Sequence, residues 1–227
     1  MYRDVGIYSV AGTIESIVTH PIEVLRTRYI NRTQMWRGIR GIYPGIGVQI
    51  MGMIPERIVF IGAKDIAVRN GYHWYQYTPV VTTMQTLVSG PFLSWKTAQI
   101  EGISRRNIPY GTVPLYLRNL IFAACLFASK EEMPKQGYHS SVGTTLLGVF
   151  SGVICSHPFD VVRIAKQSIF RDKSYYDMYN WLSMMGKDQG YIHTMWRGCL
   201  GRLLVACIGI TTLVETTEYL KDTLERN

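Results

Sequence analysis

The sequence predicts an all-α membrane protein with six transmembrane helices, arranged as three tandem two-helix repeats with pseudo-threefold symmetry. Three observations predict this fold class. Six apolar stretches recur along the chain, a proline motif with charged residues recurs in alternate stretches, and an aromatic–glycine step recurs before the others. Each stretch is close to the ~20 residues that a helix needs to cross a bilayer.

The composition agrees with a membrane protein. Of 227 residues only 18% are charged and 47% are hydrophobic, whereas soluble domains carry roughly 25% charged residues. The net charge of +8 fits nucleic acid, a membrane surface or an acidic ligand. The four cysteines lie singly in apolar runs, so we expect reduced packing residues. The first residues show no clear cleavage site or transit segment, so we expect any targeting information to be internal.

The apolar stretches cover residues 5–20, 45–63, 79–95, 111–129, 141–156 and 198–214. Each contains polar residues or small ones, as expected of helices that line a wet cavity. The segments between them are basic and aromatic, which is typical of a membrane interface. The polar interruptions leave a soluble all-α protein as the alternative.

The repeats appear in the proline motif. Residues 19–26 read THPIEVLR, residues 156–163 read SHPFDVVR, and residues 90–96 hold a degenerate copy. An aromatic–glycine step follows each copy at Gly45, Gly111 and Gly198, and an acidic residue lies 20 positions after each glycine. The chain therefore divides into repeats 1–70, 77–134 and 140–227 within one domain. Only the third linker is long enough for a helix of its own, near 176–188.

The motif residues predict two gates. A proline inside a helix kinks it, so three kinked helices are expected to converge at one end of a bundle. The acid and base of each motif are three residues apart and share a face, which allows a ring of ion pairs between repeats. The first ring comprises Glu23, Arg26, Lys96, Asp160 and Arg163. A second ring at the opposite end comprises Asp65, Arg69, Glu131, Glu218 and Lys221.

These motifs resemble those of the mitochondrial carrier family, over essentially the whole chain. Repeats one and three match the family pattern P-x-[DE]-x-x-[KR] and its aromatic–basic–glycine step, whereas repeat two matches weakly. The resemblance implies a monomeric alternating-access exchanger of the mitochondrial inner membrane with one central site. It also implies cardiolipin sites at the helix starts. Their residues are Trp196, Arg197, Gly198, Gly45 and Gly111.

The chain also departs from the family pattern. The first two linkers are short, so we expect their matrix-side helices to be missing or vestigial. In the family, the acid of one repeat pairs with the base of the next, which implies the pairs Glu23–Lys96 and Asp160–Arg26. Leu93 stands at the acidic position of repeat two. We therefore expect Arg163 to lack a partner and the gate to be weakened.

The resemblance places substrate contacts on the even-numbered helices, with a further cavity position on the first helix at Glu15. A charge such as Arg118 in an apolar run is costly unless it faces water or a ligand, and arginine holds carboxylate or phosphate in a planar fork. We therefore expect a small anionic metabolite, with a carboxylate or oxo-acid favoured. A nucleotide or S-adenosylmethionine carrier is the alternative. The candidate residues are Arg118, Asn119, Arg202, Gln49, Met53 and Glu15.

The sequence offers little for an enzyme. The glycines from 38 to 52 do not fit a dinucleotide-binding fingerprint, there is no P-loop, and the five histidines have no metal-ligand spacing. We expect no catalytic residues, no metal and no cofactor. Two further alternatives remain: a carrier-fold membrane protein without transport or with a proton leak, and a soluble basic helical protein that binds nucleic acid. The favoured interpretation has no nucleic acid polymer as partner.

Overall fold

The protein is all-helical, as predicted, in the part of the chain that the computed structural model describes: residues 2–36, 38–103, 111–138, 140–168, 170 and 173–226. The side chains of Asp65, Glu218 and Lys221 lie outside this description. No strand occurs in these ranges. The elements are α1 (Tyr2–Asn31), η1 (Ile39–Ile42), α2 (Ile46–Arg69), α3 (Trp74–Glu101), α4 (Thr112–Glu132), η2 (Pro134–Gln136), α5 (Ser141–Gln167), α6 (Tyr175–Gln189), α7 (Tyr191–Met195) and α8 (Cys199–Arg226).

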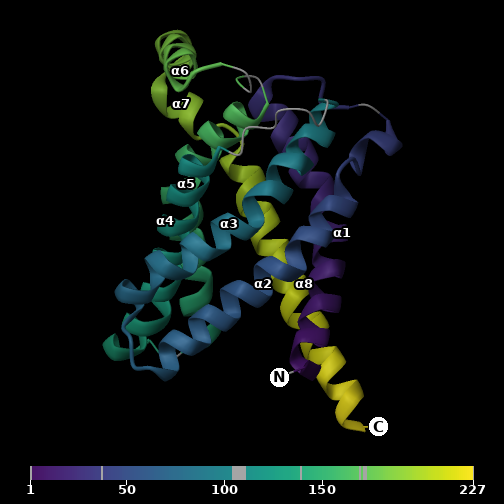
Figure 1. Ribbon diagram of the computed structural model, residues 1–227, viewed down its shortest axis with the longest axis vertical. Coiled ribbons are helices and arrows are strands. Elements are labelled where there is room, and N and C mark those ends of the chain that lie inside the picture. The colour runs from purple at the N-terminus through teal and green to yellow at the C-terminus, as the bar shows by residue number, and fades with distance from the viewer. Residues whose placement is uncertain are drawn as a thin grey trace.

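The six long helices pack as a closed ring. Each of α1, α2, α3 and α4 contacts the next long helix in the chain, α5 contacts α8, and α8 packs back against α1. Figure 1 shows α1 and α8 side by side, with α6 and α7 at the opposite end from the start of α1 and the end of α8. The odd-numbered helices α1, α3 and α5 also contact one another. The ring is therefore narrowest where these three helices contact one another.

Three helical segments are long and apolar enough to cross a membrane: Ile46–Arg69, Thr112–Gln136 and Gly143–Gln167. The other long helices, α1, α3 and α8, have 30, 28 and 28 residues. At 1.5 Å per residue they are each about 42 Å or longer, which exceeds the ~30 Å hydrocarbon core. Every long helix extends beyond the apolar stretch that predicted it, because polar residues continue the helix at its ends.

Burial is inverted relative to a water-soluble protein. Arg26, Lys96, Asp160 and Arg202 are buried, whereas large apolar side chains such as Leu87 point outward at 66% exposure. A soluble protein hides few unpaired charges and exposes few large apolar patches. In a bilayer, apolar side chains are favoured on the outer surface, because this surface contacts lipid instead of water. The fold therefore fits a membrane protein whose polar groups face inward.

Small residues allow the closest helix contacts. A Cβ added at Gly52 of α2 would lie 2.5 Å from Cβ of Phe92 on α3. Gly148 and Gly152 form a G-x-x-x-G step on α5, and an added Cβ at Gly152 would lie 3.1 Å from the carbonyl oxygen of Phe122 on α4. Steps of this kind let helix backbones approach closely in membranes, where van der Waals packing drives association. These glycines therefore fix the spacing of neighbouring helices.

The helix expected near 176–188 is α6. It begins with a capping box, in which the Ser174 hydroxyl accepts from the Asp177 amide at 3.1 Å and the Asp177 carboxylate accepts from the Ser174 amide at 3.0 Å. These two bonds satisfy backbone donors that a helix start leaves unpaired. In the shorter first linker, the described residues form the 3₁₀ turn η1.

Candidate functional site

The odd-numbered helices converge at the end that carries the motif prolines. Pro21, Pro91 and Pro158 lie inside α1, α3 and α5. Two interhelical ion pairs join these helices: Lys96 binds Glu23, and Arg26 binds Asp160. Both are the pairs that the sequence predicted. They tie α1 to α3 and α1 to α5.

The expectation that Arg163 lacks a partner is wrong. Its Nε donates to Asp160 Oδ1 at 2.9 Å, and its Nη1 donates to Gln167 Oε1 at 2.8 Å. Both partners lie on α5 itself, one turn before and one turn after Arg163. The guanidinium is therefore paired even though Leu93 offers no carboxylate. The prediction considered only partners from another repeat.

A neutral contact joins α3 to α5 where an ion pair was missing. Gln167 is fully buried; its Nε2 donates to Ser94 Oγ at 2.9 Å, and its Oε1 accepts from Thr97 Oγ1 at 3.2 Å. The three odd-numbered helices are therefore linked pairwise, twice by charge and once by hydrogen bonds.

A second polar layer lies beyond these links, at the helix ends. Asn31 Nδ2 donates to Glu101 Oε1 at 2.9 Å, and Asn31 Oδ1 accepts from Ser168 Oγ at 2.8 Å. Asn31 is buried, so its amide connects the ends of α1 and α3 with the residue that follows α5. Two polar layers thus close this end of the ring.

Arg118 and Arg202 reach the same cluster from the even-numbered helices. Arg118 Nε of α4 lies 3.7 Å from Asp160 Oδ1, and Arg202 of α8 interacts electrostatically with the same carboxylate. Arg202 Nη2 also donates to Ser156 Oγ at 2.8 Å. Arg26 and Arg163 bind the same carboxylate, so three guanidinium groups share Asp160, with Arg202 held close by through Ser156. The cluster carries a large excess of positive charge.

Several donors of the cluster remain unsatisfied. Arg26 Nε, Arg118 Nε and Arg202 Nη1 are buried and have no acceptor among the described residues. Arg26 and Arg202 are 9% and 6% exposed, whereas the Arg118 side chain is 27% exposed. A buried donor without an acceptor costs about 1–3 kcal/mol, and more when it is charged. The cluster is therefore suited to an anion, with Arg118 as its most accessible member.

The other predicted substrate residues are occupied elsewhere. Gln49 Oε1 contacts His20 Nδ1 at 2.6 Å, and Asn119 Nδ2 donates to Thr86 Oγ1 at 3.1 Å. Both amides are thereby used to join neighbouring helices. Buried Met53 accepts from Ser16 Oγ at 3.4 Å. Only Arg118 and Arg202 of the six candidates meet in the arginine cluster.

Glu15, the remaining candidate, forms an ion pair with Arg57 of α2. Arg57 and its neighbour Glu56 were not among the residues predicted from the sequence; Glu56 Oε1 accepts from Gln85 Nε2 at 2.8 Å. The signal was present, because both charges interrupt an apolar run just as Arg118 does. These contacts join α1 to α2 and α2 to α3.

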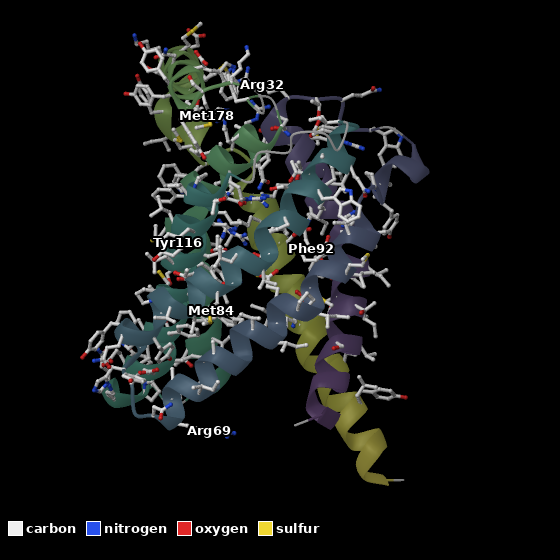
Figure 2. The ribbon with its side chains drawn as sticks, viewed as in Figure 1. Arg32, Arg69, Met84, Phe92, Tyr116 and Met178 are labelled. Carbon is white, nitrogen blue, oxygen red and sulfur yellow. The ribbon has the colours of Figure 1, made fainter. Side chains whose placement is uncertain are left out.

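The predicted second gate lies mostly outside the described side chains, since Asp65, Glu218 and Lys221 are not described. Arg69 is exposed at the end of α2, and Figure 2 places it at the opposite end of the bundle from Arg32. Glu131 Oε1 accepts from Tyr77 Oη at 2.6 Å. A ring of ion pairs at this end therefore stays a prediction.

The three predicted glycine steps occupy equivalent places. Gly45, Gly111 and Gly198 precede α2, α4 and α8 with φ of 84°, 52° and 78°, in the left-handed region that favours glycine. Each packs against the next odd-numbered helix in the ring. An added Cβ at Gly45 would lie 3.2 Å from the Lys96 carbonyl oxygen, and one at Gly198 would lie 3.3 Å from Arg26 Cγ.

At the third step, Trp196 is 39% exposed and Arg197 is partly buried. Arg197 Nε donates to the Tyr29 carbonyl at 2.8 Å, and its guanidinium lies 4.3 Å from the centre of the Tyr29 ring. This arginine is thus held against α1. A lipid headgroup at this step stays a prediction.

The two histidines before the motif prolines make matching contacts. His20 Nε2 lies 2.9 Å from the Pro44 carbonyl oxygen, and His157 Nε2 lies 3.0 Å from the Arg197 carbonyl oxygen. Each of these carbonyls belongs to the residue before the step glycine. The histidines therefore hold an odd-numbered helix to the start of the even-numbered helix of the same repeat.

Neither a comparison with protein-family models nor a search of curated proteins finds a match for this chain.

Proposed function

We propose that this chain is a six-span carrier of the mitochondrial carrier type, which exchanges a small anionic metabolite across the mitochondrial inner membrane by alternating access. One observation carries the proposal. Arg118 and Arg202 come from different helices and converge on a buried cluster with excess positive charge and unsatisfied donors. Carboxylate or phosphate oxygens satisfy such guanidinium groups bidentately.

The packing of the helices supports the repeat architecture. The six long helices form a closed ring. The histidine contacts and the left-handed glycines occur at equivalent positions of the sequence motifs. In this proposal, the links among α1, α3 and α5 form the closed matrix-side gate. The charge of the cluster also separates the candidate substrates. A dicarboxylate, oxo-acid or nucleotide brings negative charge, whereas S-adenosylmethionine carries a sulfonium and fits the cluster poorly.

Exchange in liposomes tests the proposal. The purified full-length chain is reconstituted with one labelled metabolite inside and a panel of carboxylates, nucleotides and S-adenosylmethionine outside. We expect saturable counter-exchange with anions, and its loss in Arg118→Ala. Arg32→Ala is the matched control, because Arg32 is exposed at the end of the bundle and lies outside the cluster. Folded protein that exchanges none of these compounds contradicts the proposal and favours a non-transporting membrane protein.

A further inference from the structure

A groove runs along the outside of the bundle between α2 and α3. It has a volume of about 640 Å³, which is within the range of pockets that bind small ligands. Ala63 and Ala67 lie one turn apart on α2 and line the groove, as do the buried residues Tyr77 and Val81 of α3. The two alanine side chains are small, so they leave space between the helices.

The groove opens toward the surface that contacts lipid in a membrane protein. Ile58 and Ile66 on α2 line it and are exposed, and so are Val80 and Met84 on α3. The segment Ile46–Arg69 is long and apolar enough to cross a bilayer. Water does not suit these walls, because a bound water needs two to four polar partners. An apolar chain suits them, since it supplies the van der Waals contacts that an empty space lacks.

The polar residues of the groove lie at one end of it. Tyr72, in the loop between α2 and α3, and Gln76, in the first turn of α3, are exposed and line this end. Arg69 is the last residue of α2 and is also exposed. Figure 2 shows Arg69 at the end of the bundle and Met84 nearer its middle. The groove is thus apolar toward the middle of the bundle and polar and basic at the end, which matches an amphiphile in one bilayer leaflet.

We propose that this groove binds an anionic phospholipid of the surrounding bilayer. One acyl chain lies along the groove, and the phosphate accepts hydrogen bonds from the Arg69 guanidinium and the Tyr72 hydroxyl, since arginine holds phosphate in a planar fork. The positive charge of Arg69 also attracts an anionic headgroup. The bound chain packs against both helices and stabilises the contact between α2 and α3. The inference requires these helices to face lipid and is independent of transport.

This site differs from the lipid sites that the resemblance implies. Those sites lie at the glycine steps, one of which is Gly45 at the start of α2. The polar end of the groove lies at the other end of the same helix. At 1.5 Å per residue, the 24 residues of α2 separate the two ends by about 36 Å. The phospholipid in the groove therefore belongs to the opposite leaflet.

Photo-cross-linking of the full-length protein in phosphatidylcholine vesicles tests the inference. The probe is phosphatidylglycerol with a diazirine near the end of one acyl chain, added as a minor component. We expect its adducts to concentrate in residues 58–67 and 76–84. Phosphatidylcholine with the same diazirine chain should label these residues about fivefold less, because it carries no net charge. Adducts spread evenly over the outward-facing helices, or equal labelling by the two probes, overturn the inference.

Two exposed arginines provide a matched pair of variants. Arg69→Gln removes the proposed phosphate contact and should weaken labelling by the phosphatidylglycerol probe about fivefold, the effect of one basic residue beside an anionic lipid. Arg32→Gln changes an exposed arginine at the opposite end of the bundle and should leave this labelling unchanged. Labelling that is as strong in Arg69→Gln as in the unmodified protein contradicts the proposal.

Filling the groove provides an independent comparison. Ala67→Phe places an aromatic ring in the groove and should abolish labelling of residues 58–67 and 76–84, although Arg69 remains. Leu87→Phe adds a ring at an exposed position of α3 that does not line the groove, and should leave the labelling unchanged. Equal labelling in these two variants, both folded, overturns the inference. If Ala67→Phe does not fold, the comparison of Arg69→Gln with Arg32→Gln decides.

Discussion

Exchanging the charges of the Glu23–Lys96 pair is the most direct perturbation of the converging helices. Glu23→Lys alone sets two ammonium groups against each other, and Lys96→Glu alone sets two carboxylates against each other. The double variant restores an ion pair of reversed polarity between α1 and α3. If the contact stabilises the closed ring, the double variant should be more stable than either single variant.

The expected loss of stability depends on how exposed the ion pair is. Breaking a fully buried pair costs about 3–5 kcal/mol, whereas an exposed pair contributes about 0–1 kcal/mol. The Lys96 and Glu23 side chains are 10% and 22% exposed. We therefore expect each single variant to lose about 2 kcal/mol, between these limits. The double variant should recover most of this loss.

The same exchange at Arg26 and Asp160 should fail to restore stability. Asp160 also faces Arg118 and Arg163, so an arginine in its place adds positive charge to an already positive cluster. Unfolding in detergent, analysed as two double-mutant cycles, checks both expectations. The reasoning is refuted if the Glu23–Lys96 exchange recovers nothing, or if the Arg26–Asp160 exchange recovers just as much.

Three further predictions concern packing, hydrogen bonding and pH. Gln167→Leu should lower the free energy of unfolding in detergent by about 3 kcal/mol, since three buried partners lose a hydrogen bond, whereas Gln167→Glu should cost far less; equal losses would contradict this. Gly52→Ala should cost about 1–3 kcal/mol by overpacking, while Gly62→Ala, which has open space, should be neutral in the same unfolding assay. The Ser174 hydroxyl and amide hold the pKa of the Asp177 carboxyl below its ordinary value. The protection factors of the α6 amides, which are exchange rates corrected for the intrinsic pH dependence of amide exchange, should therefore be highest at neutral pH and fall as the pH drops below about 4; Ser174→Ala should weaken this pH dependence.

The sequence predicted the existence of the long helices better than their ends. Hydropathy marked the apolar stretches, but α1 continues to Asn31 and α5 to Gln167, well beyond these stretches. These extensions carry the charged residues of the converging end. Polar residues inside a closed ring form hydrogen bonds and ion pairs with one another. A helix can therefore continue beyond the end of its apolar stretch.

The pairs Glu23–Lys96 and Arg26–Asp160 were predictable because the proline motif recurs in the sequence and resembles a motif whose acids and bases pair between helices. The hydrogen-bond partners of Gln49 and Asn119 could not be predicted in this way. Whether an amide faces the interior or a neighbouring helix depends on the rotation of both helices, which no single repeat position specifies. Arg57 was missed although its charge interrupts an apolar run, the signal that identified Arg118.

The three links among α1, α3 and α5 are unequal. A neutral hydrogen bond contributes about 0.5–1.5 kcal/mol net, less than a well-paired buried charge loses when one partner is removed. The link between α3 and α5 consists of neutral hydrogen bonds made by Gln167, whereas the two ion pairs both depend on α1. With Leu93 where the other two motifs have an acid, both ion pairs involve α1, and the ring of helices is still closed. Asp160 is the carboxylate that Arg26, Arg118 and Arg163 share.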